Sequence, residues 1–240
     1  IPLIHGADGS KLSKRHGALG VDAYRDMGLL PAAVRNYLLR LGWSHGDQEI
    51  FSTEEAISLF DLSSVNRAAA RFDLTKLENV NSQYLRETSS EDLCLPVIQR
   101  LETETRKMLS EIEKTRIKDG LESLKSRAKT LIDLSEMAQI YLSGPPTIKS
   151  EKALKVLSTQ EALASLSKTL GSLKTIEARD WNSSNIENML RSTAEVEGLK
   201  LGNLAQPLRA ALTGLDASPS LFEVAALLGK DETLLRIENL

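Results

Sequence analysis

Hydrophobic residues recur at intervals of three and four along most of the chain after residue 20, which predicts an almost continuous series of helices. One helix is expected to begin at Pro31, because proline is well tolerated at a first helical position, and to end at Gly42. Near the carboxyl end, Gly229 is expected to end one helix before a last short helix that carries Leu234, Leu235 and Ile237. The pattern predicts a mainly all-α fold.

Several helix starts carry a capping signature, a hydroxyl residue followed three positions later by glutamate, which can satisfy two free backbone N–H groups. The signature occurs at Ser52, Ser158 and Ser184, each with Glu at the third position beyond it. The pair Ser218-Pro219 is likewise expected to open a helix, as an N-cap followed by proline. These starts define the helical segments of the second half of the chain.

The non-helical parts of the chain are few. Residues 1–4 have the pattern of a strand, and Asp8-Gly9 predicts a turn after it. Residues 42–46 form a turn between helices, and the Gly-Pro-Pro run in 143–146 is the strongest break, which we expect to divide two helical subdomains. Because the first residue is Ile rather than Met, we expect the chain to be the carboxyl-terminal part of a longer protein.

Composition narrows the protein class. The 240 residues are 41% hydrophobic and 26% charged, ordinary values for a globular protein, and the ten aromatic residues are too few for a module that binds nucleic acid mainly by stacking. Trp43 and Trp181 are expected in the core. The single cysteine, Cys94, excludes an internal disulfide and is expected to be a buried small residue of a protein in a reducing compartment. No run approaches the roughly 18 apolar residues of a membrane span, so a cytoplasmic protein without membrane contact is expected.

Positive charge is concentrated in two segments. Residues 1–40 hold six Lys or Arg against three Asp, and residues 97–129 hold nine against six acidic residues, although the net charge of the whole chain is −3. Basic surfaces on an acidic body suit a selectively chosen anionic partner. Ordinary solvated helix faces would give the same pattern, and charge alone favours that simpler interpretation.

The segment from Ile4 to Gly17 has the composition of a phosphate-contacting loop, with three lysines or arginines and two serines among several glycines. It is not a P-loop, because only two residues separate Gly6 from Gly9 and Ser10 stands before Lys11.

The run Lys11-Leu12-Ser13-Lys14-Arg15 resembles the KMSKS signature of class I aminoacyl-tRNA synthetases, and residues 1–21 resemble the version found in bacterial glutamyl-tRNA synthetases. Residues 23–52 and 72–85 are similar to the stem-contact region of that family. Residues 198–237, with the runs "PLRAALTG" and "SPSLF", are similar to its anticodon-binding end. The resemblance covers essentially the whole chain.

The resemblance implies catalytic roles for the basic loop, which closes over ATP in this family. It implies that Lys14, with Lys11 as a weaker candidate, stabilises the negative charge that develops on pyrophosphate, and that Ser13 helps to hold the ATP phosphates. Leu12 and Arg15 depart from the commonest residues of the signature, the first at a packing position.

The family's second signature, a His-x-Gly-His run that binds ATP, is absent from this sequence. His5, His16 and His45 are each followed by Gly and are expected to be turn residues, so no metal site is predicted. ATP and Mg²⁺, like glutamate, would be bound only in an intact enzyme that supplies the nucleotide-binding domain. These 240 residues are therefore not expected to hold ATP stably or to aminoacylate tRNA.

By resemblance, residues 1–21 are the end of a catalytic domain and residues 22–86 a stem-contact region. Residues 87–144 and 145–240 are then two helical subdomains that bind the anticodon of tRNA-Glu, the expected partner.

The positions that match the family's anticodon-contacting residues are Arg127, Arg209, Ser218, Pro219 and Leu221. RNA readers of this kind contact unstacked bases on their Watson–Crick edges. Each position also has a purely structural interpretation: helix capping for Ser218 and Pro219, core packing for Leu221, and a solvated charge for Arg209. The alignment at Arg127 is loose.

Two functions remain open at this level. The favoured one is the tRNA-binding part of a glutamate–tRNA ligase, a monomer by family precedent, with charging of tRNA-Gln as a variant. The alternative is a non-enzymatic, all-helical interaction scaffold whose basic loop is merely solvated.

Overall fold

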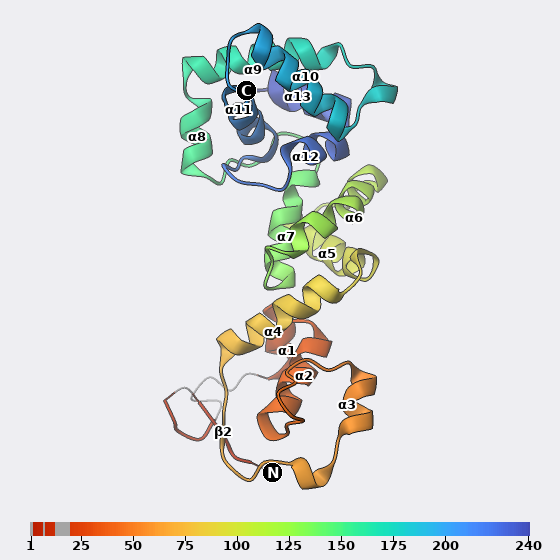
Figure 1. Cartoon of the computed structure of the whole chain (residues 1–240), viewed down its shortest axis with the longest axis vertical. Coiled ribbons are helices and arrows are strands. Elements are labelled where there is room, and N and C mark those ends of the chain that lie inside the picture. Colours follow the sequence, from red (N-terminus) through yellow and green to blue (C-terminus); the bar gives the residue numbers. More distant parts are fainter. Residues whose placement is uncertain (1, 7, 13–19) are drawn as a thin grey trace. The chain divides into compact units, whose positions relative to one another are not determined.

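The structure is a computed structural model of the chain and describes residues 2–6, 8–12 and 20–240. It is mainly helical, with two short strands in the described part (Figure 1). Contacts divide the chain into two compact units: unit 1 comprises residues 1–100 and 125–136, and unit 2 comprises residues 101–124 and 137–240.

The elements of the first half of the chain run in this order: β1 (Ile4–His5), α1 (Val21–Asp26), α2 (Pro31–Gly42), α3 (Thr53–Leu59), η2 (Leu62–Ser64), β2 (Ala70–Arg71), α4 (Leu74–Glu87), α5 (Ser90–Thr105) and α6 (Glu111–Lys125). The second half comprises α7 (Leu131–Ala138), η3 (Gln139–Tyr141), α8 (Glu151–Leu157), α9 (Gln160–Lys174), η4 (Ala178–Asp180), α10 (Ser183–Val196), α11 (Leu201–Thr213), α12 (Leu221–Leu228) and α13 (Lys230–Glu238).

Unit 1 is built on the packing of α2 against α4, with the parallel strands β1 and β2 at one side. The strands pair Ile4 with Ala70 and His5 with Arg71. One hydrophobic cluster in this unit contains these side chains: Tyr24, Met27, Leu29, Val34, Tyr37, Leu41, Phe72 and Leu77. Such a cluster stabilises the unit through the removal of apolar surface from water.

Two buried asparagines connect the segments of unit 1. The Asn81 side chain accepts a hydrogen bond from the Leu30 amide (2.7 Å) and donates one to the Lys129 carbonyl (2.6 Å). It thereby links α4 to the start of α2 and to the turn before α7. The Asn36 side chain donates to the Glu49 carbonyl (2.8 Å) and accepts from the Phe51 amide (3.0 Å). These bonds satisfy loop backbone groups that would otherwise be costly to bury.

Unit 2 has α11 at its centre, where this helix contacts α8, α9, α10, α12 and α13. The α11 side chains Leu204, Leu208, Ala211 and Leu212 are almost wholly buried. Gly214 ends the helix in the left-handed region (φ 67°), and a Cβ there would stand 2.2 Å from the Thr147 carbonyl oxygen. The residue after α11 must therefore be glycine, since both the backbone angle and the space exclude a side chain.

A buried ion pair fixes the segment that precedes α8. Arg236, only 2% exposed, pairs with Glu232 (Nε to Oε1, 2.8 Å) and donates to the backbone carbonyls of Ile140, Leu142 and Leu212. Glu232 also accepts from the Gly144 amide (2.8 Å). Burial lowers the pKa of Arg236, and the Glu232 carboxylate opposes this effect.

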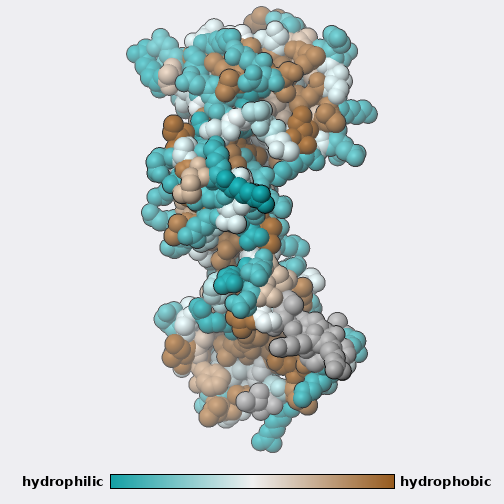
Figure 2. All heavy atoms as spheres, turned by 180° about the vertical axis from the view of Figure 1, so that it is seen from behind, coloured by the Kyte–Doolittle hydropathy of each residue, from teal (hydrophilic) through white to brown (hydrophobic). Residues whose placement is uncertain are grey.

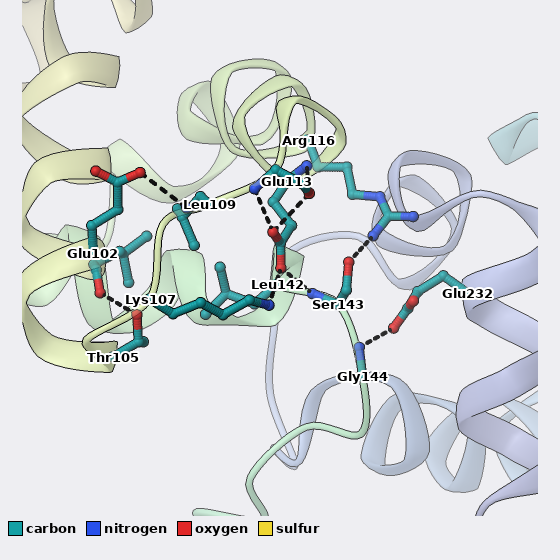
Figure 3. A network of polar contacts seen from close by, with 12 residues as sticks. Glu102, Thr105, Lys107, Leu109, Glu113, Arg116, Leu142, Ser143, Gly144 and Glu232 are labelled. Atoms are coloured by element: carbon teal, nitrogen blue, oxygen red, sulfur yellow. Dashed lines mark hydrogen bonds and ion pairs between the residues drawn. The ribbon is translucent and has the colours of Figure 1, made fainter.

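A second buried carboxylate, Glu113, holds the same segment from the other side (Figure 3). It accepts from the Ser143 amide (2.9 Å) through one oxygen, and from the amide and hydroxyl of Ser110 (2.8 and 2.7 Å) through the other. The Lys107 ammonium lies 3.5 Å from it. Glu113 thus caps the start of α6 and binds the chain just before the Gly-Pro-Pro run.

The predicted mainly all-α fold is confirmed, as are several individual elements. Pro31 is the first residue of α2, and Ser52 forms a reciprocal capping box with Glu55. Gly229 ends α12, and α13 follows it. The turn at Asp8-Gly9 is present, with Gly9 at φ 80°. Residues 142–150 contain no helix, as the prolines predict, although the chain on both sides of them belongs to unit 2.

Three predicted helix starts are wrong. Ser158 is the C-cap of α8, where its hydroxyl donates to the Leu154 carbonyl, so Thr159 caps α9 instead. Ser184 already lies inside α10, which is capped by the extended residue Asn182. Helix α12 begins at Leu221 and not at Pro219, with Ser220 at the N-cap. In each case several neighbouring residues are able to cap the helix, and the path of the chain before the helix determines which of them does so.

The strand pattern and some burial predictions also need correction. Among residues 2–4, only Ile4 is in a strand, and the second strand, β2, lies in a region expected to be helical. His5 lies in β1 rather than in a turn, His45 is exposed in a non-helical segment before Gly46, and His16 lies outside the described residues. Trp43 is buried as expected, whereas Trp181 and Cys94 are only half-buried.

The Glu113 network generates a pH prediction. Burial by itself would raise the pKa of Glu113, but the hydrogen bonds from Ser143 and Ser110 and the nearby Lys107 charge outweigh it and lower the pKa from 4.5 to about 2. Folding therefore favours the ionised form. The stability from this group is complete above about pH 4.5 and is lost as the pH falls toward 2, by about 3 kcal/mol in all.

We expect Glu113→Gln to lower the free energy of unfolding at pH 7, and the difference from the parent chain to shrink between pH 4.5 and 2. Urea unfolding at a series of pH values measures this. The control is Glu111→Gln, because the Glu111 side chain is 88% exposed. A Glu113→Gln effect that is equal at pH 7 and pH 3 would contradict the assignment.

Candidate nucleic-acid interface

The amino-terminal basic loop begins as a tight hairpin after β1. The Gly6 amide donates to the Ser10 carbonyl (2.9 Å), the Gly9 amide to the Gly6 carbonyl (3.0 Å), and the Leu12 amide to the Ile4 carbonyl (2.9 Å). This geometry places the predicted phosphate-contacting residue Lys11 in an exposed position opposite His5. The other predicted members of this group, Ser13 and Lys14, lie outside the described residues.

A second polar group lies in unit 2, between α11 and α12. The Arg209 guanidinium donates through Nη1 to the carbonyls of Ser218 (3.3 Å) and Pro219 (2.9 Å) and to the Ser218 hydroxyl. The Ser218 hydroxyl in turn donates to the Pro219 carbonyl (3.0 Å). The structure therefore brings Arg209 together with Ser218 and Pro219, which follow it by nine and ten residues in the sequence. These three residues are termed the Arg209 group. Arg209 is half-buried, whereas Ser218 and Pro219 are buried.

Leu221, the next of the predicted anticodon-contacting positions, is the first residue of α12 and is 2% exposed. Its side chain belongs to the core of unit 2, so any contact with a base would involve the backbone at the start of the helix. Ser220, the residue between the buried Pro219 and Leu221, is exposed. The exposed residues of this loop are Asp216, Ala217 and Ser220.

Residues that sequence reasoning missed fix the other side of this loop. The Asp216 carboxylate accepts from the Ser150 hydroxyl (2.6 Å) and lies 3.7 Å from the Lys152 ammonium. The Ser150 hydrogen bond lowers the pKa of Asp216. Asp216 lies two residues before Ser218 and ties the loop to the start of α8. The only signal in the sequence was a polar residue in the loop between Gly214 and Pro219, and polar loop residues are common in any protein.

A groove lies beside α11 in the same unit. It has a volume of about 490 Å³, and its polar lining includes Lys152 and Lys155 from α8, Glu161 from α9, and Asn203 and Gln206 from α11. Two lysines and two amides at one concave surface provide both phosphate attraction and hydrogen bonding to base edges. The groove and the Arg209 group share α11 as their support.

The fifth predicted position, Arg127, is exposed in the turn between α6 and α7. It belongs to unit 1, whereas the Arg209 group belongs to unit 2. The turn is closed by a hydrogen bond from the Ala128 amide to the Lys125 carbonyl (3.3 Å), and the Lys125 ammonium donates to the Thr88 carbonyl (2.9 Å). The backbone around Arg127 is thus well supported, and its side chain faces solvent.

Metal-binding clusters and membrane-spanning helices are both absent from the part of the chain that the structure describes. No group of three or more His, Cys, Asp or Glu residues there is arranged to hold a metal ion. No helix within those same ranges combines the length and hydrophobicity that crossing a membrane requires.

Comparison with known families matches the two halves of the chain separately. Residues 1–79 match the family described as "tRNA synthetases class I (E and Q), catalytic domain". Residues 92–240 match the family described as "Anticodon binding domain". The first match contains the hairpin and Lys11, and the second contains the whole Arg209 group.

Curated relatives are similar over the full length of the chain. A glutamate–tRNA ligase of Azorhizobium caulinodans is 51% identical over 100% of this chain and 51% of its own length. A protein named glutamate–tRNA ligase 2 of Paramagnetospirillum magneticum is 50% identical over 100% and 50%. The chain therefore spans about half the length of the curated relatives it matches.

Solved structures agree with these matches. A glutamate tRNA ligase from Elizabethkingia meningosepticum, crystallised in complex with its amino acid, aligns with a TM-score of 0.82 at 30% identity, over 99% of this chain and 49% of that one. The glutamate-tRNA synthetase of Elizabethkingia anophelis aligns with a TM-score of 0.78 at the same identity. Since the anticodon-binding match alone covers more than half of the residues, the chain belongs to the anticodon binding domain family.

Proposed function

We propose that this chain is the tRNA-reading part of a glutamate–tRNA ligase and that its nucleic-acid partner is tRNA-Glu. The observation that carries the proposal is the Arg209 group, which assembles Arg209, Ser218 and Pro219 within a region that matches an anticodon binding domain. The relatives' names and the class I catalytic match over residues 1–79 support the same assignment.

Anticodon recognition would depend on preorganised backbone at the loop that ends at Leu221. Arg209 holds the Ser218 and Pro219 carbonyls from one side, and Asp216 ties the loop to α8 from the other. A loop fixed in this way can present backbone and hydroxyl groups to the Watson–Crick edges of unstacked bases at little entropic cost. We propose that Arg127, an exposed arginine of unit 1, contacts a further anticodon base.

The basic loop would serve the chemical step of the whole enzyme. ATP, bound with Mg²⁺, supplies the pyrophosphate leaving group on which negative charge develops. Lys14 and Lys11 would provide positive charge at that position, and Ser13 a hydroxyl donor to phosphate. The hairpin between Gly6 and Leu12 would set the place where this loop begins.

A scaffold function is the second candidate, and one observation favours it. An apolar groove of about 400 Å³ lies between α2 and α3, lined by side chains such as Leu39, Phe51, Ile57 and Phe60. Elsewhere, hydrophobic side chains on the face drawn in Figure 2 are interspersed with polar ones. Single exposed apolar residues are normal on a protein surface. We therefore favour tRNA binding over a scaffold function. We expect the whole protein to be a cytoplasmic, monomeric enzyme.

The first prediction concerns base reading. We expect the 240-residue chain to bind tRNA-Glu more tightly than the same tRNA with an altered anticodon, and the difference to persist at higher salt. Arg209→Ala should weaken binding of tRNA-Glu by about 10- to 100-fold, the range expected for lost hydrogen bonds to a charged group. Fluorescence titration at two salt concentrations measures both effects.

Controls separate recognition from folding. Arg191→Ala removes an exposed arginine that pairs with Glu187 on α10 and should leave binding unchanged. Ser218→Thr, which keeps the hydroxyl, should bind better than Ser218→Ala. Equal and strongly salt-dependent binding of both tRNAs would show that only phosphate attraction operates and would count against the proposed base reading.

The second prediction concerns catalysis. We expect the 240-residue chain to show no glutamate-dependent exchange of pyrophosphate into ATP, because its sequence lacks a His-x-Gly-His signature. The Lys14→Ala variant controls for a contaminating host enzyme, since contaminating activity would persist in it. Exchange that is present in the parent chain and absent from Lys14→Ala would disprove the expected catalytic incompleteness.

A further inference from the structure

A small pocket of about 210 Å³ lies in unit 1, between α2, β2 and α4. Three cationic side chains line it: Arg40 from α2, Arg71 from β2 and Lys76 from α4. Glu49 is the one carboxylate of its lining, so the formal charge of the lining is +2. The remaining walls include apolar side chains such as Leu41 and Val80. The charge and size of this pocket are complementary to a compact anion.

The three cations are incompletely neutralised in the structure. A single Glu49 oxygen lies 2.8 Å from the Lys76 ammonium and 3.8 Å from Arg40 Nη2. Arg40 Nη1 is buried and has no hydrogen-bond partner among the described residues. A buried guanidinium N–H without an acceptor is costly, and a ligand oxygen would relieve that cost. Arg71 forms no ion pair with the described part of the chain and is exposed.

The backbone that carries these cations is held by hydrogen bonds between elements. Asn36 binds the Glu49 carbonyl and the Phe51 amide, which fixes the segment that bears Glu49. The Tyr37 hydroxyl accepts from the Asp73 amide (2.7 Å), three residues before Lys76. The strand bearing Arg71 is fixed by the bond from the Phe72 amide to the His5 carbonyl (2.8 Å). The backbone positions of the cations are therefore fixed before a ligand arrives, which reduces the entropic cost of binding.

The pocket also adjoins the amino-terminal hairpin. Arg71 pairs in register with His5, and its Nη2 lies 3.6 Å from where a Cβ would stand at Gly9. The hairpin residue Lys11 is itself opposite His5. A ligand held by Arg71 would thus lie beside the loop proposed to handle phosphate.

From these observations we infer that the pocket of Arg40, Arg71 and Lys76 is a binding site for a phosphate group. Arginine presents a planar fork of donors that matches phosphate, and lysine adds a point charge. A liquid water occupies about 30 Å³, so the volume accommodates a phosphate with several waters. The phosphate has two candidate sources. One is a backbone phosphate of the bound tRNA, for which the inference rests on the proposed function, and the other is free phosphate or pyrophosphate.

Glu49 has a specific part in this site. The Lys76 hydrogen bond and charge lower the pKa of Glu49, so its carboxylate is ionised at neutral pH. It satisfies Lys76 and part of Arg40 when no phosphate is present, and it competes electrostatically with an entering anion. Removing this charge should therefore tighten phosphate binding, whereas removing a cation should weaken it.

The test uses the 240-residue chain and four variants: Arg71→Gln, Lys76→Gln, Glu49→Gln and the control Arg86→Gln. Arg86 is an exposed arginine on α4 that does not line the pocket. In the first arm, alkylation of tRNA-Glu phosphates by ethylnitrosourea is mapped with and without protein. In the second arm, inorganic phosphate and pyrophosphate are titrated while the side-chain N–H signals of arginine are followed by NMR.

For a tRNA phosphate, we expect one or two adjacent phosphates to be protected by the parent chain and by Arg86→Gln, and exposed again in Arg71→Gln and Lys76→Gln. Each of these two variants should weaken tRNA binding about threefold to tenfold, and the dependence of log K on log salt should fall by about one. For a free phosphate, saturable arginine shifts should appear with pyrophosphate, weaken in the same two variants, and occur at lower concentration in Glu49→Gln.

Either pattern supports the site and identifies its source. The site is overturned if Arg71→Gln and Lys76→Gln match Arg86→Gln in protection and affinity and if neither phosphate shifts the arginine signals. Failure of the proposed function is recognised separately, since the parent chain would then not bind tRNA-Glu, and the second arm would still decide for or against the pocket.

Discussion

The buried Arg236 guanidinium is the interaction on which the geometry of unit 2 depends. It lies on the last helix, yet it donates to backbone carbonyls at Ile140, Leu142 and Leu212, in segments that are far apart in the sequence. Its partner Glu232 binds the Gly144 amide. Removing either charge would leave the other buried without compensation, which is far more costly than the small net stability of such a pair. The pair therefore determines where these segments lie.

The proposed recognition loop follows from this constraint. Arg236 holds the Leu212 carbonyl near the end of α11, and Gly214 then turns the chain through a conformation that only glycine adopts without strain. The loop that follows is held by Arg209, from the same helix, and by Asp216. Its backbone is thus fixed from three directions before any RNA is present. Such preorganisation is what base reading by backbone and hydroxyl groups requires.

Unit 1 uses neutral amides for the same purpose. Asn81 binds one backbone group in each of two separate segments, and Asn36 binds two backbone groups of the segment 49–51. The Tyr37 hydroxyl binds the Asp73 amide. These residues satisfy loop backbone groups without introducing charge. The nearby charged residues Arg40, Glu49 and Lys76 are therefore not needed for that purpose. Arg40 and Lys76 share one oxygen of Glu49, which does not satisfy the donors of both. The lining of the pocket between α2, β2 and α4 therefore keeps a net positive charge.

The sequence by itself determined the helical class and the elements whose signals are local. Pro31 and Ser52 act on backbone groups within three residues of themselves, so their patterns predict helix starts without knowledge of the rest of the chain. The same local signals were wrong at Ser158, Ser184 and Pro219, where several adjacent residues could cap the helix and the path of the preceding chain determined which of them did so.

The positions Arg209, Ser218 and Pro219 were identified through family resemblance, but their mutual hydrogen bonding was not. Only the tertiary structure decided that grouping, the pairing of β1 with β2, and the pocket of Arg40, Arg71 and Lys76. These features join residues up to 66 positions apart, as Ile4 and Ala70 show, and contacts over such separations leave no periodic trace in a sequence.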